Sequence, residues 1–432
     1  MQKHAFNEGL LAYLAASPTP FHAVTSMVGI LKDKGFKPLA EGDAWSVKPG
    51  KYYVVRNGSS IVAFVLGKDS PVKTGIRLVG AHTDSPCLKL KPRPETLAQG
   101  YLQFGVEVYG GVLLAPWFDR DLSLAGRVTC QGADNSITNY LINFERAIAT
   151  VPSLAIHLDR EVNNARSINP QRDIPPVIMR ADKAESLEPR LIAQIKKEHR
   201  GAKVKRILGH ELSFYDTQAP AITGFNNDFI ASARLDNLLS CYTGMMSLLE
   251  ASPDVTSLLV CNDHEEVGSA SAEGAQGPFL RSVIERLLPE VDARYQAISK
   301  SLLISTDNAH GIHPNYADRH DSNHGPIMNK GPVIKVNTNQ RYATNSETSA
   351  YFESLCRTAR VPVQVFVNRT DMACGSTIGP LTAKEIGVRT LDVGVPTFAM
   401  HSIRELGGVD DAHHLHKALT RFYKDTGPLG AG

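Results

Sequence analysis

The chain has 432 residues, which is enough for two domains or for one large domain with an insertion, and its composition is that of an ordinary globular protein. Its 46 Lys and Arg residues nearly balance 44 Asp and Glu residues, so the charge argues against nucleic acid or an anionic membrane as a partner. No apolar run reaches the length of a membrane span, the N-terminus lacks the order of a signal peptide, and no C-x-x-C pair occurs, so we expect a cytoplasmic protein.

The N-terminal segment, residues 1–90, predicts the first part of an α/β domain. Apolar residues recur at helical spacing in 6–17 and again in 21–35, where a glycine suits the end of the helix. Residues 52–67 predict a β-hairpin across an Asn-Gly turn, and residues 76–82 predict a strand. Two helices therefore precede the first strands.

In residues 91–229 the sequence pattern changes to strand and loop signals, so we expect these residues to form an inserted β-rich domain. Its runs "YLQFGVEVYGGVLL" and "GRVTC" favour strands, whereas "NPQRDIPP" favours a loop. Residues 230–432 return to strands alternating with helices, which indicates a parallel or mixed sheet. The expected fold class is therefore α/β, with a central mixed β-sheet flanked by helices and with an inserted β-rich domain.

Acidic and histidine side chains occur repeatedly where an apolar strand ends or a helix begins. The segments concerned are "GAHTDSP", "ARLDN", "NDHEEVGS", "STDNAH" and "AMHSIRE". Because ligands bind outside the carboxyl ends of strands in open α/β sheets, we expect these segments to converge on one site. Their candidate metal ligands are His82, Asp236, Glu266, Asp307 and His401.

Five such ligands exceed what one tetrahedral zinc ion takes from a protein, but they suit two divalent ions that share a bridging carboxylate. Of the adjacent pair Glu265 and Glu266, one would ligate while its neighbour takes a proton from the water that the metal site activates. Asp84, two residues after His82, could orient that imidazole. Zinc is expected, and cobalt or manganese would accept the same ligands.

Each of these residues taken alone is more often a helix cap, a turn residue or a hydrogen-bonded core histidine. The loop "HGIHPNYADRHDSNH" holds four histidines, but their irregular spacing around a proline favours exposed loop positions over a second metal site. His310, close behind Asp307, is the one expected to reach the cleft.

The five segments that carry the candidate ligands belong to a larger set of motifs that is typical of one protein family. Together with "SPTPFHAV", "PSLAIHLDR", "GPVIKVNTNQRYATN" and "CGSTIGP", they make the chain resemble the M18 metallopeptidases, the aspartyl aminopeptidases, over nearly its whole length. The resemblance implies removal of an N-terminal residue from peptides by a dinuclear metal site on a metallopeptidase domain with an inserted dimerisation domain. It also implies that Asp236 bridges the metals, that Glu265 is the general base and that Asp84 stands beside His82.

Two further expectations come from the resemblance alone. His157 would enter the active site of a neighbouring subunit and stabilise the oxyanion there, within a tetrahedral homododecamer built from dimers; by itself, His157 predicts only a surface histidine at a strand end. Lys335 would pair with an acidic substrate side chain, with Tyr342 and His310 nearby; by itself, Lys335 also suits an edge strand, where a lysine prevents aggregation.

The expected substrates are peptides with a free N-terminus and an acidic first residue. An aminopeptidase with a neutral preference, and a two-metal deacylase of N-acyl amino acids, would use the same ligands. A non-catalytic assembly protein is the alternative from another class, and the presence of Glu265 argues against it because a scaffold needs no base.

Overall fold

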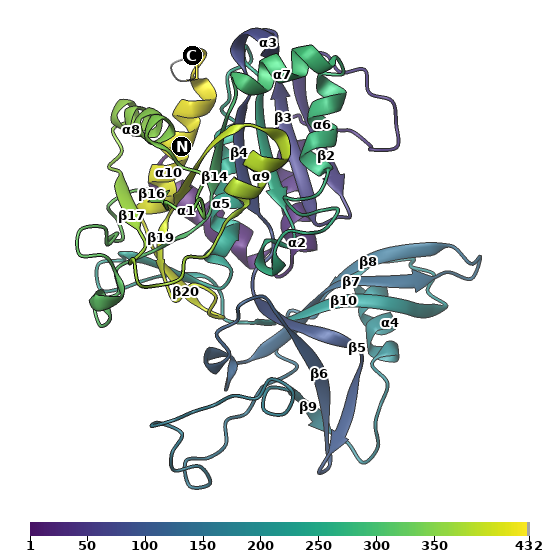
Figure 1. Ribbon diagram of the computed structural model, residues 1–432. Helices are drawn as coiled ribbons and strands as arrows, with labels where there is room; N and C mark the ends of the chain where they lie inside the picture. Colours follow the sequence, from purple (N-terminus) through teal and green to yellow (C-terminus); the bar gives the residue numbers. More distant parts are fainter. Residues whose placement is uncertain (430–432) are drawn as a thin grey trace. The chain divides into compact units, whose positions relative to one another are not determined.

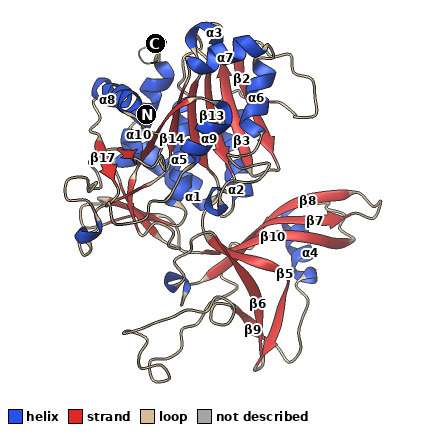
Figure 2. Ribbon diagram, in the orientation of Figure 1, coloured by secondary structure: helices blue, strands red, loops and turns tan. Residues whose placement is uncertain are grey.

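The computed structural model describes residues 1–429 and divides into two compact units (Figure 1). Unit 1 comprises residues 1–84, 220–400 and the chain from 405 onward, and unit 2 comprises residues 85–219 and 401–404. Unit 2 is therefore inserted in the chain of unit 1. Its main segment runs from residue 85 to residue 219, whereas the sequence predicts an inserted domain from 91 to 229. Figure 2 shows unit 1 as a row of strands with helices packed against it, and unit 2 as mostly strands and loops.

The central sheet of unit 1 has nine strands in the order β1-β2-β3-β13-β4-β14-β18-β16-β17. Its middle strands β13, β4, β14 and β18 are parallel to one another, whereas β3 and β16 run antiparallel to their inner neighbours. The predicted mixed sheet and the α/β class are therefore confirmed. The strands of this sheet are β1 (Lys37–Pro38), β2 (Gly50–Arg56), β3 (Ser60–Leu66), β4 (Arg77–His82), β13 (Ser257–Asn262), β14 (Leu302–Thr306), β16 (Val333–Val336), β17 (Gln364–Val367) and β18 (Arg389–Gly394).

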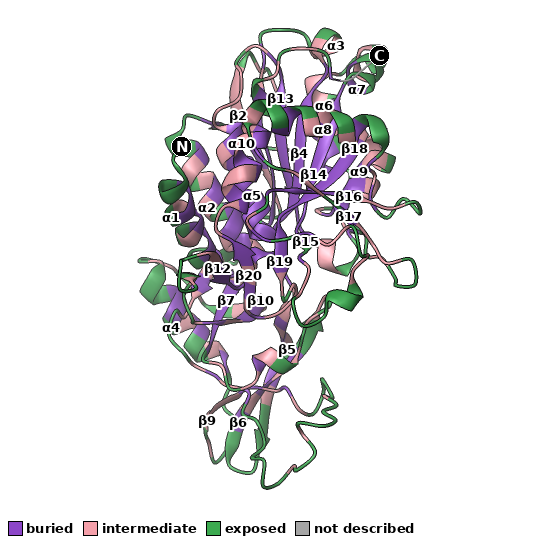
Figure 3. Ribbon diagram, turned by 90° about the vertical axis from the view of Figure 1, so that its left-hand side faces the viewer, coloured by how far each residue is buried: buried purple, intermediate pink, exposed green. Residues whose placement is uncertain are grey.

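Both faces of this sheet are buried, and alternate residues of each strand serve a different core. In β3, Ile61 and Ala63 pack into the core on one face, whereas Val62 and Phe64 pack into the core on the other face. Helices cover both faces, which is why the middle strands are mostly apolar and are buried along nearly their whole length (Figure 3). The helices of unit 1 are α1 (Lys3–Ala15), α2 (Pro20–Asp33), α3 (Pro71–Thr74), α5 (Leu235–Leu248), α6 (Phe279–Leu287), α7 (Val291–Ser299), α8 (Ser346–Ala359), α9 (Ile378–Ile386) and α10 (Asp411–Lys424).

The predicted Asn-Gly turn is confirmed, and the structure adds a local feature at the start of helix α8. The hairpin of β2 and β3 turns at Asn57 and Gly58, both with positive φ, as the Asn-Gly pair predicts. Helix α8 begins with a capping box in which the Asn345 side chain accepts the N–H of Thr348 at 2.9 Å. All six cysteines are free thiols.

A second sheet of unit 1 has the order β11-β12-β20-β19-β15 and joins distant parts of the chain. Its strands are β11 (Ala221–Thr223), β12 (Phe229–Ser232), β15 (Ala309–His310), β19 (Pro396–Phe398) and β20 (Glu405–Gly408). The antiparallel pairing of β12 with β20 places Ser232 opposite Glu405, directly before helix α5 begins.

Unit 2 is a six-stranded antiparallel sheet in the order β8-β7-β10-β5-β6-β9, with its own hydrophobic core. Helix α4 (Glu188–Glu198) packs Leu191 and Ile195 into this core. Its strands are β5 (Cys87–Ala98), β6 (Tyr101–Tyr109), β7 (Leu122–Gln131), β8 (Ile137–Asn143), β9 (Val177–Arg180) and β10 (Arg206–Asp216). No helix within residues 1–429 is long and apolar enough to cross a membrane.

Candidate active site

The site lies where the parallel strands β4, β13 and β14 of unit 1 end. The register of the pairs places Asn262, the last residue of β13, opposite His82, the last residue of β4. Asp307 directly follows β14, and Glu265 and Glu266 form the short 3₁₀ turn η2 (Glu265–Val267) shortly after β13. The strand ends therefore bring these side chains to one edge of the sheet, as the sequence predicts.

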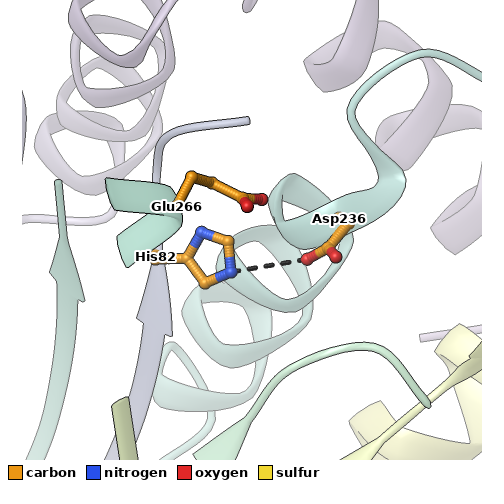
Figure 4. Close-up of side chains that lie close together, drawn as sticks. All are labelled: His82, Asp236 and Glu266. Atoms are coloured by element: carbon orange, nitrogen blue, oxygen red, sulfur yellow. Dashed lines mark ion pairs between the residues drawn. The ribbon is translucent and has the colours of Figure 1, made fainter. Parts of the chain in front are cut away.

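His82, Asp236 and Glu266 form the core of the cluster, with one potential ligand atom from each lying within 4.8 Å of the others. Figure 4 shows their polar ends pointing toward one another from the end of β4, the start of α5 and the turn η2. The His82 Nε2 atom lies 3.4 Å from an Asp236 oxygen and 3.5 Å from an Asp307 oxygen. Four of the five predicted ligands thus gather within unit 1.

The nitrogen and oxygen atoms of this cluster are suited to bind a divalent metal ion. One imidazole faces three carboxylates in a largely buried space, and this combination of nitrogen and oxygen donors is the one that zinc and related ions take. Burial opposes a charge on His82, but the carboxylates of Asp236, Asp307 and Asp84 raise its pKa well above the usual value. Burial, with the charge of Asp236, also raises the pKa of Glu266 well above its ordinary range. Such crowding of buried acids is stabilised by a cation.

Asp236 is held at the mouth of α5 by its backbone. Its N–H donates to an oxygen of Glu405 at 3.0 Å, and the neighbouring Asn237 side chain donates to the carbonyl of Thr306 at 2.8 Å. Asp236 and Asn237 have non-helical dihedral angles, so the regular helix begins only after them. Glu405 is 2% exposed and was not singled out by the sequence; the signal available was the acid that ends the "AMHSIRE" motif.

Asp84 links the turn η2 to the end of β4. Its two carboxylate oxygens accept the backbone N–H groups of Glu265 and Glu266, each at 3.1 Å. One of these oxygens also lies 3.4 Å from Nδ1 of His82, and the Asp84 carbonyl lies 3.1 Å from the same nitrogen. Strand β4 ends at His82, so Asp84 reaches the imidazole from the following turn and not from a continuing strand.

Glu265 stands beside the cluster, next in sequence to Glu266. Burial, together with the negative charges of Asp307, Asp84 and Asp236, raises the pKa of Glu265 to about 8. A carboxyl group with a pKa near neutral is suited to accept and return a proton. Both roles that the sequence suggests for the glutamate pair are therefore compatible with its position.

Lys335 is buried on β16, with only 2% of its surface exposed. Its Nζ atom lies 3.4 Å from an oxygen of Asp307, donates to the Asn308 carbonyl at 3.1 Å, and lies 5.1 Å from the ring centre of Tyr342. Strand β16 pairs on both sides, with β18 and β17. The alternative expectation of an edge-strand lysine is therefore wrong, because β17 takes the edge position.

Burial opposes the charge of Asp307, but Lys335 and His82 overcome it and hold the pKa of that carboxyl well below its usual range. Tyr342 is buried, and burial together with Cys374 raises the pKa of its hydroxyl. His310 is exposed on β15, with its ring centre 5.8 Å from that of Phe366.

Asp392 is a second buried carboxylate that sequence reasoning missed. It lies opposite Lys335 in the antiparallel pair of β16 and β18. Its carboxylate accepts the N–H of Ala343 at 2.7 Å and the hydroxyl of Thr377 at 2.6 Å, which joins the loops on either side of the lysine strand. A charged residue inside the apolar strand "TLDVG" was the available signal.

The two remaining predicted histidines belong to unit 2. His157 lies in an exposed turn of the long connection between β8 and β9, so it is not at a strand end. His401 belongs to the short segment 401–404 of this unit, where its Nδ1 atom lies 3.0 Å from the Gly111 carbonyl. The roles of both residues stay predictions.

Comparisons with known proteins agree with this chemistry. The family model described as "Aminopeptidase I zinc metalloprotease (M18)" matches residues 13–423. The chain is 59% identical over 425 residues to the "Probable M18 family aminopeptidase 2" of Pseudomonas entomophila, covering 98% of this chain and 99% of that protein. The corresponding protein of Pseudomonas aeruginosa strain LESB58 is 58% identical over 420 residues, covering 96% and 97%.

Two solved structures extend the comparison to the fold. A chain in the cryo-EM structure of the Ape4 and Nbr1 complex superposes with a TM-score of 0.94 at 37% identity, covering 98% of this chain and 86% of that chain. The mApe1 dodecamer of S. cerevisiae superposes with a TM-score of 0.84 at 28% identity, covering 98% and 97%.

Proposed function

This chain belongs to the M18 family of zinc aminopeptidases, and from that premise we propose that it removes acidic residues, Asp and Glu, from the N-terminus of peptides at a dinuclear metal site. The observation that carries the proposal is the cluster of His82, Asp236 and Glu266, whose ligand atoms lie within 4.8 Å of one another beside the buried Lys335.

The metal ions would be held by His82, Asp236, Glu266 and Asp307, with Asp236 as the bridge and His401 completing the set. A bound pair of divalent ions supplies Lewis acidity, which polarises the scissile carbonyl and lowers the pKa of water. Zinc agrees with the family description, and cobalt or manganese would suit the same oxygen and nitrogen donors.

Glu265 acts as the general base. It accepts a proton from the attacking water and later donates it to the leaving amine. Asp84 holds this base in position through the N–H groups of Glu265 and Glu266. The residue proposed for the acid and base steps therefore lies on a turn whose backbone N–H groups are held by the Asp84 carboxylate.

Lys335 selects acidic substrates. Its buried ammonium, which lies near the ring of Tyr342, would compensate the cost of burying a substrate carboxylate, and His310 is proposed to act on the same side. The proximity of Lys335 to Asp307 supports this role, because it places the cation next to a metal ligand.

The working form is a homo-oligomer, proposed as a tetrahedral dodecamer built from dimers through unit 2. The support is the similarity to the mApe1 dodecamer. His157 would enter the neighbouring subunit's active site and stabilise the oxyanion there, for which its exposed position is suited. We place the enzyme in the cytoplasm on the composition of its sequence.

The test is hydrolysis of the p-nitroanilides of Asp, Glu, Leu and N-acetyl-Asp by the wild type and by Glu265→Gln, each after chelation and after Zn²⁺ or Co²⁺ is restored. We expect turnover of the Asp and Glu substrates only with metal, no turnover of the blocked substrate, and a loss of at least about 100-fold in kcat for the variant with its metal content unchanged. Preference for Leu would remove the role of Lys335, and turnover of the blocked substrate would indicate a deacylase. No turnover with any metal would favour the non-catalytic alternative.

A further inference from the structure

Unit 2 contains a cavity of about 530 Å³ that has no part in the proposed reaction. It lies between helix α4, strand β9 and the segment that follows β8. Most of its wall is apolar, and the larger apolar side chains that line it are Phe104, Phe144, Ile148, Ile178, Met179 and Leu187. Its size and its apolar wall are those of sites that bind small molecules.

The same cavity is bordered by three cationic side chains, Arg146, Arg190 and Lys197. Arg190 pairs with Glu185 at 2.8 Å, whereas neither Arg146 nor Lys197 has an ion-pair partner within residues 1–429. Glu198, which follows Lys197 in the sequence, already accepts the N–H of Asn143 at 2.9 Å. The cavity therefore combines an apolar wall with an excess of positive charge.

We propose that this cavity binds a small amphipathic anion, which has an apolar chain or ring and a carboxylate or similar group at one end. The apolar part would gain about 0.8 kcal/mol for each methylene group that it buries, which favours a ligand long enough to fill the cavity. The anionic end would pair with Arg146 and Lys197, because a charge close to an apolar wall needs a partner. A neutral or cationic ligand of the same length meets the same wall without this pairing.

The probe is dodecanoate, used below its micellar concentration and titrated calorimetrically into the full-length protein. We expect saturable binding with one site per chain, at least tenfold weaker binding of dodecyltrimethylammonium, and weaker binding of dodecanol. Ile148→Trp, which narrows the cavity from its wall, should abolish binding. The double variant Arg146→Gln with Lys197→Gln should weaken dodecanoate binding about tenfold.

Lys196→Gln is the matched control, because Lys196 stands next in sequence but lines a different hollow on the other side of α4. It should leave dodecanoate binding unchanged. Circular dichroism and aminopeptidase activity of each variant show whether unit 2 and the enzyme remain folded.

Absence of saturable binding by the wild type would overturn the proposal, as would binding that a folded Ile148→Trp variant retains. Equal affinity for the cationic detergent would overturn the assignment of an anion. An acidic peptide is then added to the complex with dodecanoate. If the peptide fails to displace dodecanoate, a protein segment is excluded as the occupant; if it displaces dodecanoate, the small-molecule assignment is overturned.

Discussion

Two carboxylates at the site, Asp84 and Glu405, act on the backbone of other site residues. Asp84 accepts the N–H groups of Glu265 and Glu266, and Glu405 accepts the N–H of Asp236. Each of these contacts holds the main chain of a residue with a proposed role, so Asp84 contributes to the position of the proposed base and Glu405 to that of a proposed ligand. Partners of this kind typically contribute 10-fold to 100-fold to metal affinity or activity.

Asp84→Asn should lower both metal affinity and kcat by about 10-fold to 100-fold. An asparagine has one acceptor oxygen, so its amide group faces an N–H that Asp84 now binds, and the negative charge beside His82 is lost. Competition with a fluorescent chelator measures the metal affinity, and initial rates with Asp-p-nitroanilide measure kcat. Asp69→Asn, at an exposed position, is the control. Unchanged metal affinity with an intact fold would contradict a positioning role for Asp84.

At the scale of single elements, helix α8 shows how a local signal sets a boundary. Asn345 precedes the helix and closes a capping box with Thr348, which fixes where α8 begins on the face of the central sheet. The loop that carries Tyr342 and Ala343 ends at this cap, and Asp392 accepts the N–H of Ala343 from the strand. The start of the helix therefore also limits the movement of the segment beside Lys335.

Asn345→Ala should lower the free energy of unfolding by about 1 kcal/mol, because alanine leaves the N–H of Thr348 without its acceptor. Urea unfolding followed by circular dichroism measures the change. Ser346→Ala, one position later and exposed, should change stability by less than about 0.5 kcal/mol. Equal effects of the two substitutions would show that the cap is not the stabilising feature.

At the scale of the whole molecule, buried charge connects the stability of the protein to pH and to metal. His416 on α10 is 3% exposed, stacks on Phe6 at 4.9 Å between ring centres and lies 3.5 Å from Glu250. Burial lowers the pKa of His416 to about 4, although Glu250 acts against this shift. Between about pH 6.5 and 4 the unfolded chain therefore binds a proton that the folded chain excludes.

The free energy of unfolding therefore decreases as the pH falls from about 6.5 to about 4, because protons bind preferentially to the unfolded chain. His416 should account for a loss on the order of 3 kcal/mol by pH 4. Urea unfolding of the wild type and of His416→Gln at several pH values should show a smaller loss in the variant. His4→Gln, at an exposed position, should follow the wild type. Parallel curves for the wild type and His416→Gln would contradict the assignment.

Metal removal should lower the melting temperature, since the carboxylates of Asp236, Glu266 and Asp307 then repel one another in a buried space. Any ion that binds only the folded chain stabilises it, so added Zn²⁺ should raise the melting temperature in proportion to the logarithm of its concentration. Differential scanning calorimetry with and without chelator measures the shift. A melting temperature that chelation leaves unchanged would argue that metal does not bind at this cluster.

The α/β class, the two N-terminal helices, the Asn-Gly hairpin and the convergence of His82, Asp236, Glu266 and Asp307 could all be predicted from the sequence. The reason is that these features depend on local patterns: apolar runs define strands, and a polar residue placed directly after a strand lies at the edge of the sheet. Because neighbouring strands of a parallel sheet run in the same direction, their carboxyl ends lie at one edge whatever their separation along the chain.

Only the tertiary structure decided which other charged residues are buried beside this cluster. Lys335 is enclosed because β16 lies between β18 and β17, and Glu405 reaches Asp236 because β20 pairs with β12, over a long separation in sequence. Such pairings depend on the packing of the whole unit, and a one-residue change of register would turn each side chain to the opposite face. The sequence by itself therefore determined the chemistry at the strand ends, whereas the neighbours of that chemistry, and the cavity in unit 2, were decided by long-range strand pairing and packing.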